Sequence, residues 1–285
     1  PRLLIQRLGP DGKPTWVGFS YELTTENGKK IANLRLEGAS KSVSWDYDDH
    51  DPNAKDSAGK VLHYSGSTDK YAIPSASNCL LCHGGDDREA GTAPIGPKVR
   101  NLNRLNTYGT QSVNQLAYMQ SKGMLDLPAG KTPADVEVFP KWNVSGSGTA
   151  AANSIDDKHQ RVRAFLEVNC QHCHNPGGGA QNSGLGLDGL DALDSDLNTK
   201  QNEGHGICKY PIAAGKAASN AFFDIVPTDA SNSLLFQRIS STEAGVKMPP
   251  LARSVVQAEA MNLIGDWINT VVDTYAESDT CKPAQ

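Results

Sequence analysis

The sequence predicts an α+β chain in which a small antiparallel β region precedes two mainly α-helical domains. Residues 1–76 contain short runs with partial alternation of apolar and polar residues, such as "WVGFSYEL" and "KSVSWDYDD", separated by turn-rich clusters such as "GPDGKP". After residue 76, apolar residues recur at helical spacing between segments rich in Pro and Gly. We therefore expect strands first and helices afterwards.

Four regions are expected along the chain. A β-rich region over residues 1–76 is followed by a first domain at 77–130, a linker at 131–153 and a second domain at 154–285. The linker is predicted because this stretch is rich in Pro, Gly, Ala and Ser. Because a strand is expected from the first residue onwards, the β-rich region is expected to be truncated.

Helices are predicted from apolar spacing and start signals. Residues 111–125, "QSVNQLAYMQSKGML", have apolar residues at helical spacing. Ser154 is a good N-cap for a helix that runs towards Cys170. A short helix over "SLLFQRI" and a long closing helix over "SVVQAEAMNLIGDWINTVVD" follow. The buried face of the closing helix is expected to contain Leu263, Ile264, Trp267, Ile268 and Val271.

Composition and charge exclude several classes of function. The chain has 285 residues, 38% of them hydrophobic, which is typical of a globular protein. It has no run of about 18 apolar residues, so no membrane span is expected. The net charge is −5 and basic residues do not cluster, so nucleic acid is not an expected partner. Neither a phosphate-binding loop nor a dinucleotide glycine motif is present.

Two short stretches, "SNCLLCHGG" and "VNCQHCHNPGGG", share the pattern Cys-x-x-Cys-His. Three-residue spacing puts both thiols on one face of a helical turn, where they can form thioethers with the two vinyl groups of a haem. The next residue then offers its imidazole to the iron. The doubled motif predicts two covalently bound haem c groups, with His83 and His174 as proximal iron ligands. The attachment residues are expected to be Cys79, Cys82, Cys170 and Cys173.

Zinc is the main alternative for two Cys-x-x-Cys pairs. Zinc-binding pairs usually lie about 15–20 residues apart. Here Cys170 follows Cys82 by 170 − 82 = 88 residues. Zinc also gives no reason for a histidine after each pair, so haem explains the pattern better. His172, between the cysteines of the second motif, is expected to face solvent or to contact a haem propionate.

The segment "VKMPPLARS" offers Met248 as the sixth ligand of the second haem iron. A thioether is a soft, neutral ligand that raises the reduction potential relative to a second histidine. Pro249 and Pro250 stiffen the segment, so that the sulfur is held without a helix. The metal ligands predicted for the second haem are therefore His174 and Met248.

The sixth ligand of the first haem stays open. The corresponding segment "GTAPIGPKVRNLNR" contains neither methionine nor histidine. An iron with only five ligands is one possibility. The candidate side chains elsewhere are Met119, Met124, His50, His63 and Lys98. The strands lead directly into the first motif, so the N-terminal region is expected to cover the first haem.

Two cysteines remain outside the motifs, and an even remainder permits one disulfide. We expect Cys208 and Cys281 to be bonded. Covalent haem attachment and a disulfide both belong to oxidising compartments. The sequence therefore predicts a periplasmic or secreted bacterial protein.

Several segments resemble a family of bacterial dihaem c-type cytochromes. The matching segments are "YAIPSASNCLLCH", "PIGPKVRNLNR", "RVRAFLEVNCQHCHNPGGGA", "GICKYP", "DIVP" and "MPPL". The second half is similar to a class I cytochrome c domain, in which Cys170, Cys173, His174 and Met248 match the haem-binding motif. Family members are often linked to quinoprotein-like or carbohydrate-binding modules. The resemblance implies an exported electron-transfer protein with two cytochrome c domains.

The expected function is transfer of single electrons between periplasmic or extracellular redox proteins. A quinoprotein dehydrogenase or another secreted oxidoreductase is the expected kind of partner. No catalytic residue is assigned, because an electron carrier needs no substrate chemistry. The alternative is a dihaem cytochrome c peroxidase-like enzyme with an open coordination site at the first haem iron.

Overall fold

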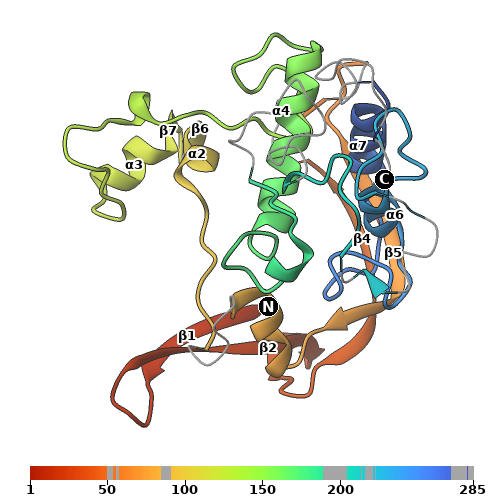
Figure 1. Cartoon of the computed structure of the whole chain (residues 1–285). Helices are drawn as coiled ribbons and strands as arrows, with labels where there is room; N and C mark the ends of the chain where they lie inside the picture. Colours follow the sequence, from red (N-terminus) through yellow and green to blue (C-terminus); the bar gives the residue numbers. More distant parts are fainter. Residues whose placement is uncertain are drawn as a thin grey trace.

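The computed structural model describes residues 1–49, 54–55, 58–84, 91–188, 204–212, 214–215, 221, 223–270 and 281. Strands occupy the N-terminal part of the chain, and the longest helices lie in the second half (Figure 1). The prediction of two mainly α-helical domains is wrong. The structure is 27% helical and 26% strand, with three small sheets in the described part of the chain.

The expected antiparallel β region is present and consists of two separate sheets. The first contains β1 (Arg2–Leu8), β2 (Pro14–Glu26) and β3 (Lys29–Leu34) in that order, and the second pairs β4 (Ala39–Asp48) with β5 (His63–Ile73). Asn27 and Gly28 join β2 to β3 with φ angles of 51° and 73°. Two positive φ angles are typical of the tight hairpin turn that Asn-Gly favours.

The region after the sheets has only short helices, which is why the first helical domain is absent from the described residues. Its elements are η1 (Ser77–Cys79), α1 (Leu80–His83), α2 (Val99–Leu102), β6 (Leu105–Tyr108), β7 (Gln111–Asn114) and α3 (Gln115–Ser121). The predicted helix over residues 111–125 is half wrong, because Gln111–Asn114 pairs with β6. The Asn114 side chain accepts hydrogen bonds from the backbone N–H groups of Leu116 and Ala117, and so fixes the start of α3 there.

The second half contains the longest helices. Its elements are α4 (Ile155–Leu166), the π-helical turn η4 (Glu167–Gln171), η5 (Gln181–Ser183), α6 (Leu234–Ser240) and α7 (Ala258–Thr270), preceded by η3 (Pro133–Asp135). The predicted N-cap is confirmed, since the Ser154 hydroxyl accepts from the Asp157 N–H at 3.0 Å. The end of the predicted closing helix lies outside the described residues.

One large hydrophobic core lies between α4, α6 and α7. Val162 and Leu166 of α4 pack with Ile264, Trp267 and Ile268 of α7, and all five side chains are buried. The predicted face of the closing helix is confirmed at those three positions, whereas Val271 lies outside the described residues. A four-residue helix such as α1 or α2 cannot bury a comparable face. This difference in core size explains why only the second half has long helices.

The expected linker packs against α4. Buried Asp157 accepts hydrogen bonds from the Ser145 hydroxyl and the Gly146 N–H, both at 2.7 Å. Arg161 donates to the Trp142 carbonyl at 2.8 Å. These contacts fix residues 142–146 along the helix that leads into the second motif.

Within the described residues, no helix has the length and apolarity needed to cross a membrane.

Candidate haem-binding site

The second Cys-x-x-Cys-His motif lines an apolar cavity. Cys170, Cys173, His174 and Met248 all line it, so the four residues predicted for the second haem come together. The empty space within it is about 880 Å³, a figure that includes open solvent at its mouth. The apolar walls include Leu166, Leu185, Leu187, Leu234, Leu235 and Ile239.

The backbone of the motif forms a closed turn at the end of α4. The N–H groups of Cys173 and His174 both donate to the Cys170 carbonyl, at 3.0 and 2.9 Å. The chain then folds back, because the Ala180 N–H donates to the Cys173 carbonyl at 3.0 Å. A Cβ atom on Gly178 would lie only 2.1 Å from that carbonyl oxygen, so this close return requires glycine.

The imidazole of His174 is oriented for a metal. Its Nδ1 lies 3.2 Å from the Ser183 hydroxyl, and that hydroxyl donates to the Ala180 carbonyl at 2.8 Å. The hydroxyl must therefore accept from Nδ1–H, which leaves the lone pair on Nε2 for a ligand. Burial, followed by the positive charge of Arg238, lowers the pKa of His174 to about 4. The neutral imidazole is the form that binds a metal ion.

The loop between α6 and α7 holds Met248 at the cavity. The Met248 N–H donates to the Arg238 carbonyl at 2.9 Å, and its side chain packs against the core of the second half. The Arg253 guanidinium donates to the carbonyls of Ile239 and Ser241, and Lys247 donates to the Arg253 carbonyl at 2.6 Å. The loop is thus tied to the end of α6, which carries the cavity wall.

Charged side chains that the sequence did not single out lie beside the cavity. Asp224 and Arg238 line it, and Lys209 forms an ion pair with Asp224 at 2.9 Å. Burial raises the pKa of Asp224, while the hydrogen bond from Lys209 lowers it. Neither these residues nor Ser183 have a spacing that relates them to the motif. Only the fold brings them to the cavity.

The first motif docks on β2. The His83 Nδ1 lies 2.8 Å from the Ala93 carbonyl, which orients Nε2 away from that carbonyl in the manner of a metal-binding histidine. The Thr92 hydroxyl donates to the Trp16 carbonyl of β2 at 2.6 Å. A Cβ atom on Gly18 would lie 2.4 Å from the Cys79 sulfur. The gold helix of the first motif accordingly lies against β2 (Figure 1).

The described candidates for the sixth ligand of the first haem are placed as follows. His63 lies 2.9 Å from Asp48 on the exposed surface of β5, and Lys98 lies 3.1 Å from Glu167. Met119 is on α3, which Figure 1 shows far from the gold helix of the first motif. Met124 is 67% exposed, and His50 lies outside the described residues. These positions do not identify a sixth ligand.

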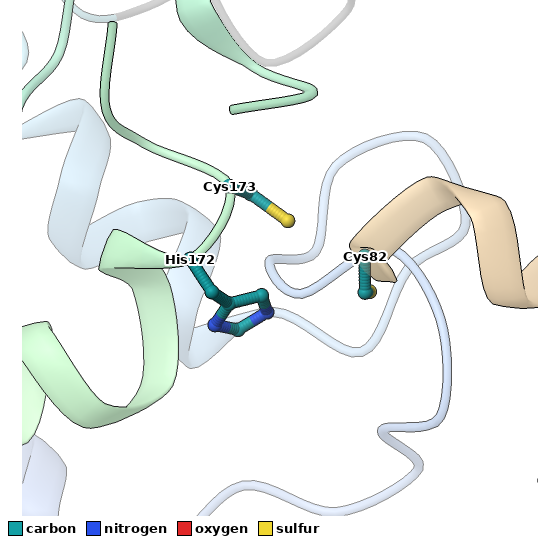
Figure 2. A group of neighbouring side chains, drawn as sticks. All are labelled: Cys82, His172 and Cys173. Carbon is teal, nitrogen blue, oxygen red and sulfur yellow. The ribbon is translucent and has the colours of Figure 1, made fainter. Parts of the chain in front are cut away.

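The two motifs meet. The ligand atoms of Cys82, His172 and Cys173 all lie within 4.8 Å of one another, and Figure 2 shows the three side chains converging from the two turns. The Cys173 sulfur also lies 3.6 Å from the Leu81 carbonyl. Hydrogen bonds from Cys173 and then from His172 lower the pKa of Cys82, whereas Cys82 raises the pKa of Cys173. His172 therefore faces the first motif, which its sequence position did not reveal.

A buried carboxylate connects the chain after the first motif to the turn before the second. Glu167 is 3% exposed and lies at the start of η4. Arg100 contacts its carboxylate at 2.5 Å and Lys98 at 3.1 Å. The same two cations also lie 3.5 Å from Asp188. This ion-pair network holds residues 98–100 against the end of α4.

The predicted disulfide is confirmed. Cys208 and Cys281 are bonded, with an S–S distance of 1.98 Å. The Cys208 N–H donates to the Ile225 carbonyl at 3.1 Å, so the bridge ties Cys281 to the core of the second half.

Comparisons with protein-family models, with curated proteins and with solved structures found no match. The resemblance to dihaem c-type cytochromes therefore stays a prediction. The function has to be inferred from the geometry of the two motifs and of the cavity.

Proposed function

We propose that this chain is a dihaem c-type cytochrome that transfers single electrons between periplasmic or extracellular redox proteins. The observation that carries the proposal is the cavity of the second half. Two cysteines at thioether spacing and a histidine from one turn, and a methionine from a separate loop, converge there. Residues 170–174 and residue 248 lie at one cavity with the wall formed by α6, although 234 − 174 = 60 positions separate the motif from the start of α6.

The residues at this cavity fit a haem. Cys170 and Cys173 offer the two sulfurs, His174 offers Nε2, and Met248 offers a soft thioether. Apolar walls keep water from the metal and so raise the reduction potential. When bound, haem supplies a one-electron couple between ferric and ferrous iron. The protein supplies attachment, axial ligands and exclusion of water.

The contact between the motifs supports two centres that work together. Cys82 and Cys173 would attach their haems at neighbouring points, because their sulfurs belong to one cluster within 4.8 Å. Two centres attached there lie within one chain and need no partner protein between them. This arrangement supports an electron carrier that accepts and delivers electrons at different places.

The compartment and the partners follow from covalent chemistry and charge. The Cys208–Cys281 disulfide supports a periplasmic or secreted location. The net charge of −5 becomes more negative when haem propionates are added. We therefore expect transient docking to a neutral or basic patch on a redox protein, such as a quinoprotein dehydrogenase or another secreted oxidoreductase.

The test is to count covalent haems. The full chain is produced with a bacterial haem-attachment system, and its mass is measured after denaturation, together with an alkaline pyridine spectrum. Two haems per chain are expected, and Cys170→Ser/Cys173→Ser should retain one. Cys208→Ser/Cys281→Ser is the control and should retain two. A wild-type chain without covalent haem would contradict the proposal.

A peroxidase-like activity is the second candidate. It is favoured by the positions of the described sixth-ligand candidates, because His63 and Lys98 are engaged by carboxylates and Met124 is exposed. Carbon monoxide binding by one ferrous haem, followed by peroxide turnover with an electron donor, would support it. Two six-coordinate haems that bind neither carbon monoxide nor cyanide would contradict the peroxidase-like activity. Electron transfer would then be the remaining proposal.

A further inference from the structure

We propose that the haem-free chain binds one Zn²⁺ ion between its two motifs, through Cys82, His172 and Cys173. The ligand atoms of these residues form one cluster, with all separations within 4.8 Å. Among the described residues, this is the one group of at least three His, Cys, Asp or Glu side chains placed closely enough to hold a metal ion. The inference goes beyond the proposed function, because it concerns a metal site made by both motifs before any haem is attached.

The distances suit a tetrahedral zinc site. Zn–S bonds of about 2.3 Å and Zn–N bonds of about 2.0–2.1 Å place ligand atoms roughly 3.4–3.8 Å apart around a tetrahedral ion. A cluster within 4.8 Å therefore needs a contraction of about 1 Å, which side-chain torsions can provide. Figure 2 shows that the His172 ring and the Cys173 thiol already point towards Cys82. Three protein ligands leave the fourth tetrahedral position for water.

The backbone holds the two turns in register. The Cys173 sulfur contacts the Leu81 carbonyl at 3.6 Å, so the second turn already touches the first. Cys173 is fixed by the hydrogen bond of its N–H to the Cys170 carbonyl at 3.0 Å. All three ligand residues are half-buried, so an ion from solvent can reach them while they remain packed.

The first cysteine of each motif is directed elsewhere. Cys79 packs on Gly18 of β2 and donates to the Ser75 carbonyl at 3.9 Å. Cys170 packs against the hydrophobic core of the second half. A metal held within a single Cys-x-x-Cys pair would have to draw one of these sulfurs out of its packing. The site across the motifs needs no such change.

The ligand chemistry favours a borderline or soft ion. Two thiolates and one imidazole suit Zn²⁺ and exclude Mg²⁺ and Ca²⁺, which take oxygen ligands. Two thiolate charges balance the charge of Zn²⁺, so the site becomes neutral when both thiols lose their protons. Zn²⁺ and covalent haem cannot occupy these cysteines together. An ion at this site binds one sulfur of each motif, so neither haem can form its second thioether while the ion is bound.

The experiment uses the full chain, produced without haem attachment and kept reduced at its motif cysteines. Zn²⁺ is titrated against a competing chelator, and the bound ion is mapped by alkylation and mass spectrometry. We expect one Zn²⁺ per chain, with protection of Cys82 and Cys173 and unchanged alkylation of Cys79 and Cys170. Co²⁺ in the same site should give thiolate-to-metal charge-transfer bands and the strong visible bands of tetrahedral cobalt.

Variants separate the proposed ligands from their neighbours. His172→Ala should weaken Zn²⁺ binding by at least about 10-fold, since even outer-shell partners cost roughly 10–100-fold in metal affinity when replaced. Gln171→Ala, in the same turn, and His63→Ala, an exposed histidine on β5, are the controls and should keep the wild-type affinity. Circular dichroism of each variant checks that the fold is retained.

Three outcomes would overturn the inference. One is a chain that binds no Zn²⁺, folded or unfolded. Another is protection of both cysteines within one motif, which an unfolded chain would also give. The third is an affinity that His172→Ala leaves unchanged. The haem count of the mature chain is a separate measurement, so the failure of one proposal is distinguishable from the failure of the other.

Discussion

Glu167→Gln tests whether the buried ion-pair network holds the chain after the first motif on the helix before the second. The substitution keeps the shape of the side chain and removes its charge. Glu167 is 3% exposed, and the Arg100 side chain that contacts it at 2.5 Å is 13% exposed. Arg100 would then face a neutral amide in a poorly solvated place, with Asp188 at 3.5 Å as its other carboxylate, whereas Lys98 is 35% exposed. Breaking a buried ion pair by neutralising one partner costs about 3–5 kcal/mol.

The expected loss of unfolding free energy can be measured as a decrease in melting temperature. A change of 1 kcal/mol shifts the melting temperature of a protein of about 150–250 residues by roughly 2–4 °C. Glu167→Gln should therefore melt roughly 6–20 °C below the wild type, by circular dichroism at one fixed haem content. High salt should change this difference little, because buried pairs are weakly screened.

The chain contains a matched control. Glu22 also lies between an arginine and a lysine, with Arg35 at 2.7 Å and Lys41 at 3.5 Å, but the glutamate and the arginine are more exposed, at 16% and 43%, and the lysine is 34% exposed. The hydrogen bond from Arg35 lowers the pKa of Glu22, so this carboxylate is ionised at neutral pH. Surface pairs contribute little, so Glu22→Gln should melt close to the wild type. Equal melting temperatures for the two variants would refute the reasoning from burial.

Three further results are expected. Met248→Ala should keep both haems and allow carbon monoxide to bind the second haem iron. Met248→His should lower the reduction potential of that haem. An unchanged spectrum in both variants would show that Met248 is not a ligand. Gly178→Ala should reduce the covalent haem count from two to one, because its Cβ would lie 2.1 Å from the Cys173 carbonyl oxygen. Gly177→Ala is the control and should keep two haems, because its Cβ would meet no atom closer than 3.6 Å. Burial lowers the pKa of His159 to about 4 from its model-peptide value of 6.5; the unfolded chain therefore binds more protons between these values, and stability should fall as pH falls through this window. His159→Gln can still accept from Trp267 and should flatten that fall in denaturant titrations at several pH values; an identical pH dependence would contradict the assignment.

The sequence determined the features that a few neighbouring residues define. Thioether spacing and a following histidine are properties of one turn, so the prediction that Cys170, Cys173 and His174 act together needed no fold, and the three residues do line one cavity. The N-cap at Ser154 is equally local, since its hydroxyl bonds only three residues ahead. The disulfide followed from the number of cysteines left over, and the cavity-lining methionine from its stiff flanking segment.

The division into two helical domains was wrong because spacing does not measure burial. Residues 111–125 have apolar residues at helical intervals, but Gln111–Asn114 has strand β6 to pair with, and Asn114 caps the helix at that point. A helix needs an apolar surface to pack on. Within the described residues, the large core lies between α4, α6 and α7, and the short helices around the first motif have no comparable surface.

Only the tertiary structure decided which distant residues meet. Ser183 orients the His174 ring, and His172 faces the first motif. Glu167 forms ion pairs with Arg100 and Lys98. No periodicity relates Cys82 to Cys173, since 173 − 82 = 91 residues separate them. Their contact results from the packing of one turn on the β1–β2 sheet and of the other at the end of α4. Such packing is set by the whole chain, so residues within one turn could be predicted and the meeting of the two turns could not.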